Sequence, residues 1–187
     1  MSAMSIPKFA DLAQFSARGF PTGYPTDDHI TLFSPQDQLH AALAFFIDQV
    51  QHSLALAMYG FDDDALATAI LRKLQDPNIF VQICLDSSQA AGVHEKKLLA
   101  TVDYPSNNVA FGQSEAGGAI MHLKMGVMDG LDSFDGSTNW SGSGETKQDN
   151  SLTFTRHPLV AAHIRNKIDI IHSSMLTQMA AKAAHAQ

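Results

Sequence analysis

The sequence predicts an α/β sandwich in which helices flank a mixed β-sheet. The chain has 187 residues, which allows one domain with a full core. Hydrophobic residues make up 45% of the chain and charged residues 17%, a composition typical of a globular protein. Short apolar segments with strand character alternate with longer amphipathic segments, and this order favours an α/β protein.

The first 28 residues are expected to form an extension, followed by a single domain over residues 29–187. Regular structure in the extension is interrupted at Pro7, Gly19, Pro21, Gly23 and Pro25. Four large apolar side chains indicate that part of the extension packs on the domain: Phe9, Leu12, Phe15 and Phe20.

The domain is expected to begin with a strand at residues 29–33 and a long helix. Ser34 suits the N-cap of this helix and Pro35 its first position, so we expect the helix to run to about residue 52. One face of the helix is apolar and consists of Leu39, Leu43, Phe46, Ile47 and Val50.

The alternation of strands and helices continues through the middle of the chain. A buried strand is expected at residues 54–59. The acidic run at residues 62–64 favours a helix start, because carboxylates stabilise the first turn of a helix. This helix should end before Pro77. The elements expected next are a strand at residues 79–85, a helix at about 94–100 and a short strand at 109–111.

Three more strands and one long helix complete the predicted domain. The strands are expected at residues 120–128, 133–136 and 150–155, and the helix at about 158–184. The apolar stripe of this helix consists of Val160, Ile164, Ile168, Ile171 and Met175.

Charge and apolar run length limit the class of protein. The net charge of −7 speaks against a surface that holds nucleic acid electrostatically, although a local basic cleft can coexist with it. No apolar run approaches the roughly 18 residues that cross a bilayer, and the first 20 residues make a poor secretory signal. We therefore expect a soluble protein, with the cytoplasm favoured. The single cysteine, Cys84, excludes an internal disulfide and is expected to be buried.

The chemically richest segment lies in the second half of the chain. His122 and Lys124 are two residues apart, so on a strand their side chains point to the same face. The turn at Gly136 can return Ser137 and Asn139 to the same place. A histidine beside a fixed positive charge, with hydroxyl and amide groups nearby, suits the binding of a phosphate and attack on it.

This spacing resembles the HKD motif of the phospholipase D superfamily, which reads His-x-Lys, four residues, Asp, six residues and Gly-Ser-x-Asn. Every fixed position is filled, with Asp129 as the aspartate. The resemblance is specific over residues 121–153 and weaker over residues 29–89. It implies the phospholipase D-like α/β sandwich and phosphoryl chemistry that uses neither a metal nor another cofactor.

Hydrolysis of a phosphodiester without a metal needs a nucleophile, a proton donor for the leaving oxygen and positive charge for the phosphoryl oxygens. His122 is the expected nucleophile. Lys124 would hold a non-bridging oxygen as a point charge, and Asn139 would donate hydrogen bonds to the same group. Ser137 is expected to orient either the histidine or the phosphate.

A histidine nucleophile works best when a carboxylate fixes its tautomer through the other ring nitrogen. Asp149 is the first candidate for this carboxylate because it follows the motif closely, and Glu145 is the second. Asp129 lies at an odd offset from Lys124 and so faces the opposite side of an ideal strand. We interpret it as a structural hydrogen-bonding residue at the strand end.

The other histidines and the single tryptophan are further candidates for site residues. None of the nine histidines has metal-ligand spacing with a second ligand, so no metal site is expected. His94 lies in a loop after a strand end, where α/β proteins place ligand contacts, with Lys96 and Lys97 as a local basic rim. Trp140 is expected in the core, although an exposed tryptophan there could stack on a base or lipid head group.

One motif supplies one catalytic histidine, whereas the phospholipase D mechanism, as the resemblance implies it, uses two. One histidine forms a phosphohistidine, and the other protonates the leaving group and then activates water. The chain therefore resembles the small single-motif bacterial endonucleases of the superfamily, which dimerise. A homodimer is expected, because a two-fold axis can bring one histidine–lysine pair from each subunit to one phosphate.

Three functions follow from these observations. The favoured function is a metal-independent phosphodiesterase that acts on nucleic acid as an endonuclease. The alternative is a phospholipase D or phosphatidyl transferase acting on phospholipid, but such members carry two motifs in a longer chain, and no amphipathic helix with a basic face is visible. The third is a non-catalytic nucleic-acid-binding domain, against which the intact histidine, lysine and asparagine speak.

Overall fold

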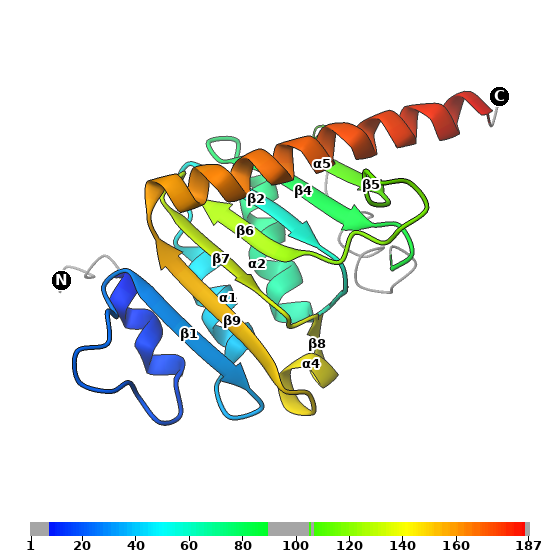
Figure 1. Cartoon of the computed structure of the whole chain (residues 1–187). Coiled ribbons are helices and arrows are strands. Elements are labelled where there is room, and N and C mark those ends of the chain that lie inside the picture. The colour runs from blue at the N-terminus through cyan, green and yellow to red at the C-terminus, as the bar shows by residue number, and fades with distance from the viewer. Residues whose placement is uncertain (1–7, 90–104, 106, 186–187) are drawn as a thin grey trace.

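A seven-stranded mixed sheet forms the middle layer of the fold, in the order β1-β9-β7-β6-β2-β4-β5 (Figure 1). The structure is a computed structural model and describes residues 8–89, 105 and 107–185. The strands are β1 (His29–Ser34), β2 (Ser53–Met58), β4 (Phe80–Asp86), β5 (Val109–Gly112), β6 (Lys124–Met128), β7 (Asp132–Gly136) and β9 (Asn150–Arg156). Strands β2, β4 and β5 are parallel, and the other pairs are antiparallel.

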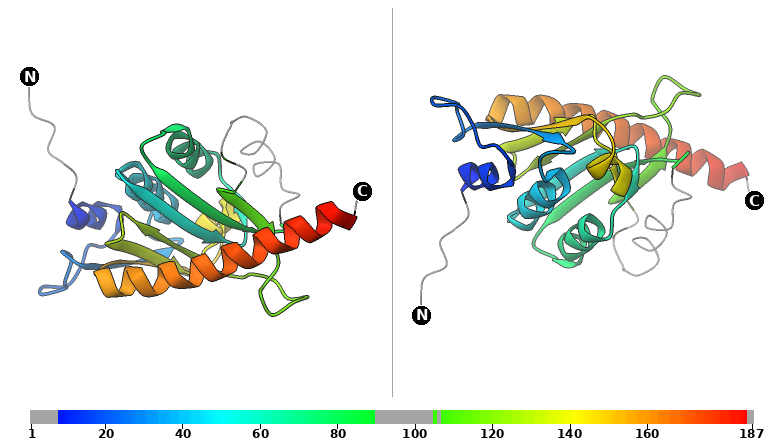
Figure 2. Two further views of the ribbon diagram at one scale, coloured as in Figure 1. Left: turned by 90° about the horizontal axis from the view of Figure 1, so that it is seen from above. Right: turned by 90° about the horizontal axis from the view of Figure 1, so that it is seen from below.

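Helices cover both faces of the sheet, so the predicted α/β sandwich is confirmed. One face carries α1 (Leu39–Asp48) and α2 (Asp64–Gln75), and the other carries α5 (Pro158–His185) (Figure 2). The smaller elements are the 3-10 helix η1 (Phe9–Phe15), helix α4 (Gly142–Thr146), and the parallel pair β3 (Phe61–Asp62) and β8 (Trp140–Ser141). No helix among the described residues has the length and apolar character to span a membrane.

Strand β2 shows how the sequence assigns its two faces. Leu54, Leu56 and Met58 belong to the core cluster on the α1 and α2 side, whereas Ala55 and Ala57 belong to the cluster under α5. Alternate residues of a strand point to opposite faces, so the large side chains fill one layer and the alanines let α5 pack closely on the other. The apolar residues of α5 in this cluster are Ile168, Ile171 and Met175.

Most predicted elements are confirmed, but the start of the first helix is wrong. Ser34 is the last residue of β1, and α1 begins only at Leu39 and ends at Asp48. The Ser34 hydroxyl donates to the carbonyls of Gly144 and Gln148, so it holds the later loop instead of capping a helix. The predicted helix at about residues 94–100 lies outside the described residues.

Two smaller differences also have local causes. The strand predicted at residues 120–128 begins only at Lys124, because the Met121 N–H bonds to the Asp86 carboxylate instead of a neighbouring strand. The packing expected of the extension is confirmed in η1, where Phe9 and Leu12 are buried in the core beneath α1. The rings of Phe9 and Phe46 meet edge to face with centroids 6.2 Å apart.

Side chains bind backbone groups of both outer strands. At the β1 edge, the N–H groups of Thr31 and Phe33 donate to the hydroxyl of Tyr24 and the carboxylate of Asp37. At the end of β5, the side-chain amide of Gln178 accepts from the N–H of Gln113 at 2.9 Å and donates to its carbonyl at 3.2 Å. The Phe111 N–H of β5 points at the sulfur of Met179.

The turn after β6 depends on Asp129, which has the left-handed φ of 52°. Its carboxylate accepts the N–H groups of Gln51, His52 and Ser53 at 3.0, 2.7 and 2.8 Å, and so ties this turn to the start of β2. Asp129→Ala should lower the free energy of unfolding by about 1–3 kcal/mol, because three N–H groups lose their acceptor and alanine is strained at positive φ.

Denaturant unfolding measures this loss, and Asp129→Asn is the matched variant. Asparagine tolerates the left-handed conformation and keeps one acceptor oxygen, so its loss should be smaller. Equal losses in the two variants, or no loss with alanine, would show that this carboxylate does not hold the turn.

Candidate active site

His122, Lys124 and Asn139 of the HKD-like motif lie at one edge of the sheet. There β2, β4 and β7 end and β6 begins (Figure 1). Met58, the last residue of β2, pairs with Lys124, the first residue of β6. Gly136 ends the adjacent β7, so the residues that follow it leave the sheet at the same edge.

His122 lies in the short segment before β6 and is exposed. The buried carboxylate of Asp86 fixes this segment by accepting the Met121 N–H at 2.6 Å, while its other oxygen accepts the N–H and hydroxyl of Ser88. The His122 ring lies against the ring of Tyr59 with centroids 4.6 Å apart. Asp86 therefore sets the position of His122 through the backbone, and the imidazole remains open to solvent.

Lys124 differs from His122 in being buried, with only 3% of its surface exposed. Its Nζ donates to the carbonyl of His122 at 2.9 Å and lies 4.9 Å from the centroid of the Tyr59 ring. No carboxylate pairs with it among the residues that the structure describes. Burial lowers the pKa of Lys124 to about 8. A buried cation without a carboxylate is suited to an anionic ligand.

Asn139 lies near this lysine site because its side chain packs against Gly60. A Cβ added at Gly60 would lie 3.1 Å from Cγ and Oδ1 of Asn139, so a side chain at residue 60 would crowd the amide. The N–H of Trp140 also donates to the Gly60 carbonyl at 2.9 Å. The Asn139 Oδ1 is buried with no partner in the described part of the chain. Tyr59 and Gly60 thus link the histidine and lysine on one side with the asparagine on the other.

Ser137 has a different set of contacts from those expected. Its hydroxyl donates to Oδ1 of Asn150 at 3.0 Å and accepts the Ser151 N–H at 3.1 Å. The Asn150 amide donates in turn to the Gly144 carbonyl at 3.0 Å. Ser137 therefore orients the turn after the motif. Asn150, which the sequence analysis did not select, links that turn to α4.

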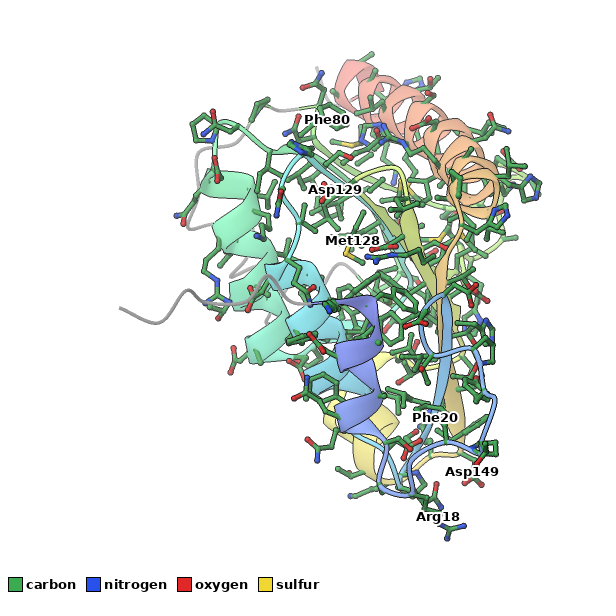
Figure 3. All side chains as sticks on the ribbon, turned by 90° about the vertical axis from the view of Figure 1, so that its left-hand side faces the viewer. Arg18, Phe20, Phe80, Met128, Asp129 and Asp149 are labelled. Carbon is green, nitrogen blue, oxygen red and sulfur yellow. The ribbon has the colours of Figure 1, made fainter. Side chains whose placement is uncertain are left out.

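Neither candidate carboxylate makes a hydrogen bond to His122 in the described part of a single chain. Asp149 is exposed just before β9, at the opposite end of the molecule from Asp129 and on the side of Arg18 and Phe20 (Figure 3). Glu145 Oε2 instead accepts the backbone N–H of His40 at 3.1 Å. Within one chain, the expected contact that would fix the tautomer is thus not formed.

The other candidate site residues are a tryptophan, an aspartate and a histidine. Trp140 is 1% exposed and packs edge-on against Phe61 at 5.2 Å, so it belongs to the core and is not available to stack on a base or lipid head group. Asp129 lies at the far end of β6 and has the structural contacts given above. His94 lies outside the described residues. No group of three or more His, Cys, Asp or Glu side chains in the described ranges is arranged to hold a metal ion.

A second polar cluster, which the sequence analysis missed, lies beneath the turn that carries Asn139. The His40 ring on α1 is buried, with Nδ1 2.8 Å from Oδ2 of Asp63 and Nε2 3.3 Å from the Asn139 carbonyl oxygen. The hydrogen bond from His40 lowers the pKa of Asp63, and burial raises the pKa of Glu145. No spacing rule relates residues 40, 63 and 145, so only the tertiary fold could reveal that their side chains form one cluster.

Comparison with known proteins identifies the family. The family described as "Cardiolipin synthase, PLD-like domain" matches residues 43–171, which include the whole motif, so the chain belongs to this family of phospholipase D-like domains. The resemblance predicted from the motif is therefore confirmed. No protein of curated function matches the chain at a significant level.

Solved structures share the fold over most of the domain. Nuc from Salmonella typhimurium, a phospholipase D family member, is 18% identical with a TM-score of 0.64, over 78% of this chain and 94% of that protein. NucT from Helicobacter pylori is 22% identical with a TM-score of 0.67, over 78% and 96%. Phosphatidylserine synthase from Haemophilus influenzae is 12% identical with a TM-score of 0.55, over 78% of this chain and 38% of that one.

Proposed function

We propose that this protein is a metal-independent phosphodiesterase that cleaves nucleic acid as an endonuclease. The observation that carries the proposal is the pairing of an exposed imidazole, His122, with the buried Lys124, which has no carboxylate partner among the described residues. Such a pair offers a nucleophile beside a preformed site for a phosphoryl oxygen. The near-complete coverage of Nuc, a phospholipase D family member, and of NucT also supports this choice, because both are single domains of similar size.

In the proposed reaction, a ring nitrogen of His122 attacks phosphorus while the bond to the leaving oxygen breaks. A second histidine gives that oxygen a proton, and a phosphohistidine remains on His122. Lys124 and the amide of Asn139 bind the non-bridging oxygens, whose negative charge increases in the transition state. The second histidine then takes a proton from water, which attacks phosphorus and releases His122.

The second histidine is proposed to be His122 of another copy of this chain. One chain carries one motif, and a two-fold axis beside the exposed His122 would present two copies to one phosphate. A carboxylate from the second copy, with Asp149 as the first candidate and Glu145 as the second, could then complete the contact that a single chain lacks. The acidic exterior implies that attraction for the substrate comes from the site itself.

Supercoiled plasmid and phospholipid vesicles, each in excess EDTA, distinguish the candidate functions. An endonuclease should nick the plasmid and leave phosphatidylcholine vesicles intact. Release of head group with intact plasmid would replace the proposal by the phospholipase alternative. Retarded plasmid mobility without any nick would identify a binding domain. Loss of nicking in EDTA that added Mg²⁺ restores would contradict metal independence.

The shared site makes a separate prediction about mixed subunits. When equal amounts of wild-type and His122→Ala chains exchange fully, activity should fall to about one quarter of that of the same total of wild-type chains, and not to about one half, because only wild-type pairs have two histidines. Plasmid nicking after co-refolding measures this. A fall to one half would mean that each chain acts alone.

A further inference from the structure

His40 lies beneath the turn that carries Asn139 and contacts three elements at once. It is the second residue of α1, after the N-cap Gln38, and only 7% of its surface is exposed. Its Nδ1 lies 2.8 Å from Oδ2 of Asp63, the N-cap of α2. Its Nε2 lies 3.3 Å from the Asn139 carbonyl oxygen and 3.7 Å from Oε2 of Glu145 on α4.

Both ring nitrogens of His40 therefore face oxygen acceptors. A neutral imidazole has one N–H and one lone pair, so one nitrogen would point its lone pair at an oxygen. Donation from both ring nitrogens fits the positions of these oxygens, two of which belong to the carboxylates of Asp63 and Glu145. Asp63 is fixed independently because its other oxygen caps α2 by accepting the Leu66 N–H at 2.9 Å. The ring is thus anchored at Nδ1, and its Nε2–H points at Asn139.

The Asn139 carbonyl connects this cluster to the candidate active site. The same oxygen also accepts the N–H of Ser141 at 2.9 Å and the hydroxyl of Thr138 at 3.1 Å, and the next N–H, that of Trp140, donates to Gly60. The peptide after Asn139 is therefore held from both sides. Its side-chain Oδ1 is buried and has no partner in the described part of the chain, so no described hydrogen bond to this oxygen sets the orientation of the amide. Backbone contacts, with packing against Gly60, must set it.

We propose that His40 is a positioning residue: its Nε2–H holds the Asn139 carbonyl and so directs the Asn139 amide at the phosphoryl group held by Lys124. The proposal rests on the proposed phosphodiesterase function. His40 itself is buried and does not touch substrate. Its effect should therefore fall on kcat more than on KM, because a misdirected hydrogen-bond donor weakens the transition state most.

Two substitutions separate the contacts of His40. The amide nitrogen of glutamine can occupy the place of Nε2, so His40→Gln keeps a donor for the Asn139 carbonyl and loses the bond to Asp63. The amide nitrogen of asparagine can occupy the place of Nδ1, so His40→Asn keeps Asp63 and loses Asn139. We expect His40→Gln to retain kcat within about 3-fold and His40→Asn to lose about 10–100-fold, with KM little changed in both.

Thermal unfolding of both variants provides the control. A purely structural role for His40 predicts that kcat falls in step with stability, whichever contact is kept, and that result would overturn the proposal. Equal kcat in the two variants would overturn it as well. The expected result is a difference in kcat between the two variants without a corresponding difference between their unfolding temperatures.

NMR tests the same contact without using activity. The backbone amide signal of Ser141 and the side-chain amide signals of Asn139 should shift in His40→Asn and stay near their wild-type positions in His40→Gln. Signals that move independently of His40 would refute the positioning role. If wild type cleaves no phosphodiester while these signals behave as expected, the proposed function alone fails.

Discussion

His122→Ala is expected to lower the rate of phosphodiester cleavage by at least ~1000-fold, because it removes the atom that attacks phosphorus and, in a shared site, the proton donor as well. The free energy of unfolding should stay nearly unchanged. The side chain is exposed and lies against the ring of Tyr59. Plasmid nicking in excess EDTA and denaturant unfolding of the same preparation measure the two quantities.

His163→Ala is the matched control, since His163 is also exposed and lies on α5, outside the motif. It should keep full activity. A direct test of the intermediate is to quench the wild-type reaction on a short substrate and look for a phosphorylated histidine by mass spectrometry. A His122→Ala protein that still nicks plasmid, or an adduct on another residue, would contradict the assignment of the nucleophile.

Lys124→Met is expected to separate activity from stability. Loss of the charge that holds a phosphoryl oxygen should lower kcat about 100–1000-fold, as removal of a single oxyanion donor does in other enzymes. Stability should be equal or higher, because methionine fills a similar volume and no longer requires a buried charge without a carboxylate partner. Single-turnover cleavage and thermal unfolding measure the two effects. Lys147→Met, at an exposed lysine just after α4, is the control.

The lowered pKa of Lys124 also predicts the pH dependence. Burial brings this pKa from 10.5 to about 8, so the free enzyme loses the phosphate-binding charge above about pH 8, and kcat/KM should fall there. The unfolded chain binds this proton more tightly, so stability should rise between about pH 8 and 10.5. A rate that stays level to pH 10, or equal slopes of stability against pH in wild type and Lys124→Met, would contradict this assignment.

The sequence predicted the fold well where local patterns determine it. The apolar runs of β2 and β4 are long and bounded by polar residues, and Asp63 is a strong N-cap, so both strands and the start of α2 lie close to the prediction. The spacing of the motif also indicated that His122, Lys124 and Asn139 lie at one edge of the sheet, because it reflects a strand, a turn and a second strand of fixed length; their catalytic roles stay a prediction.

The sequence predicted poorly where a side chain serves a distant backbone group. Ser34 has the local pattern of a helix cap, but its hydroxyl donates to the carbonyls of Gly144 and Gln148, more than a hundred residues later. Asp86 and Asn150 support the candidate site through the Met121 N–H and the Ser137 hydroxyl, and neither contact follows from spacing. A carboxylate role for Asp149 or Glu145 likewise depends on long-range geometry that spacing does not determine.

The closed edges of the sheet restrict how two copies of this chain can associate. An open edge strand offers a row of N–H and carbonyl groups that can template pairing with another chain. Here the side chains of Tyr24 and Asp37 accept hydrogen bonds from N–H groups of β1. At the end of β5, the Gln178 amide bonds both the N–H and the carbonyl of one residue, as a neighbouring strand would. A sheet continued from one subunit into the next is therefore disfavoured. A homodimer would instead have to form through loops and helix surfaces around His122, and the same protection should suppress fibril growth when the protein is concentrated.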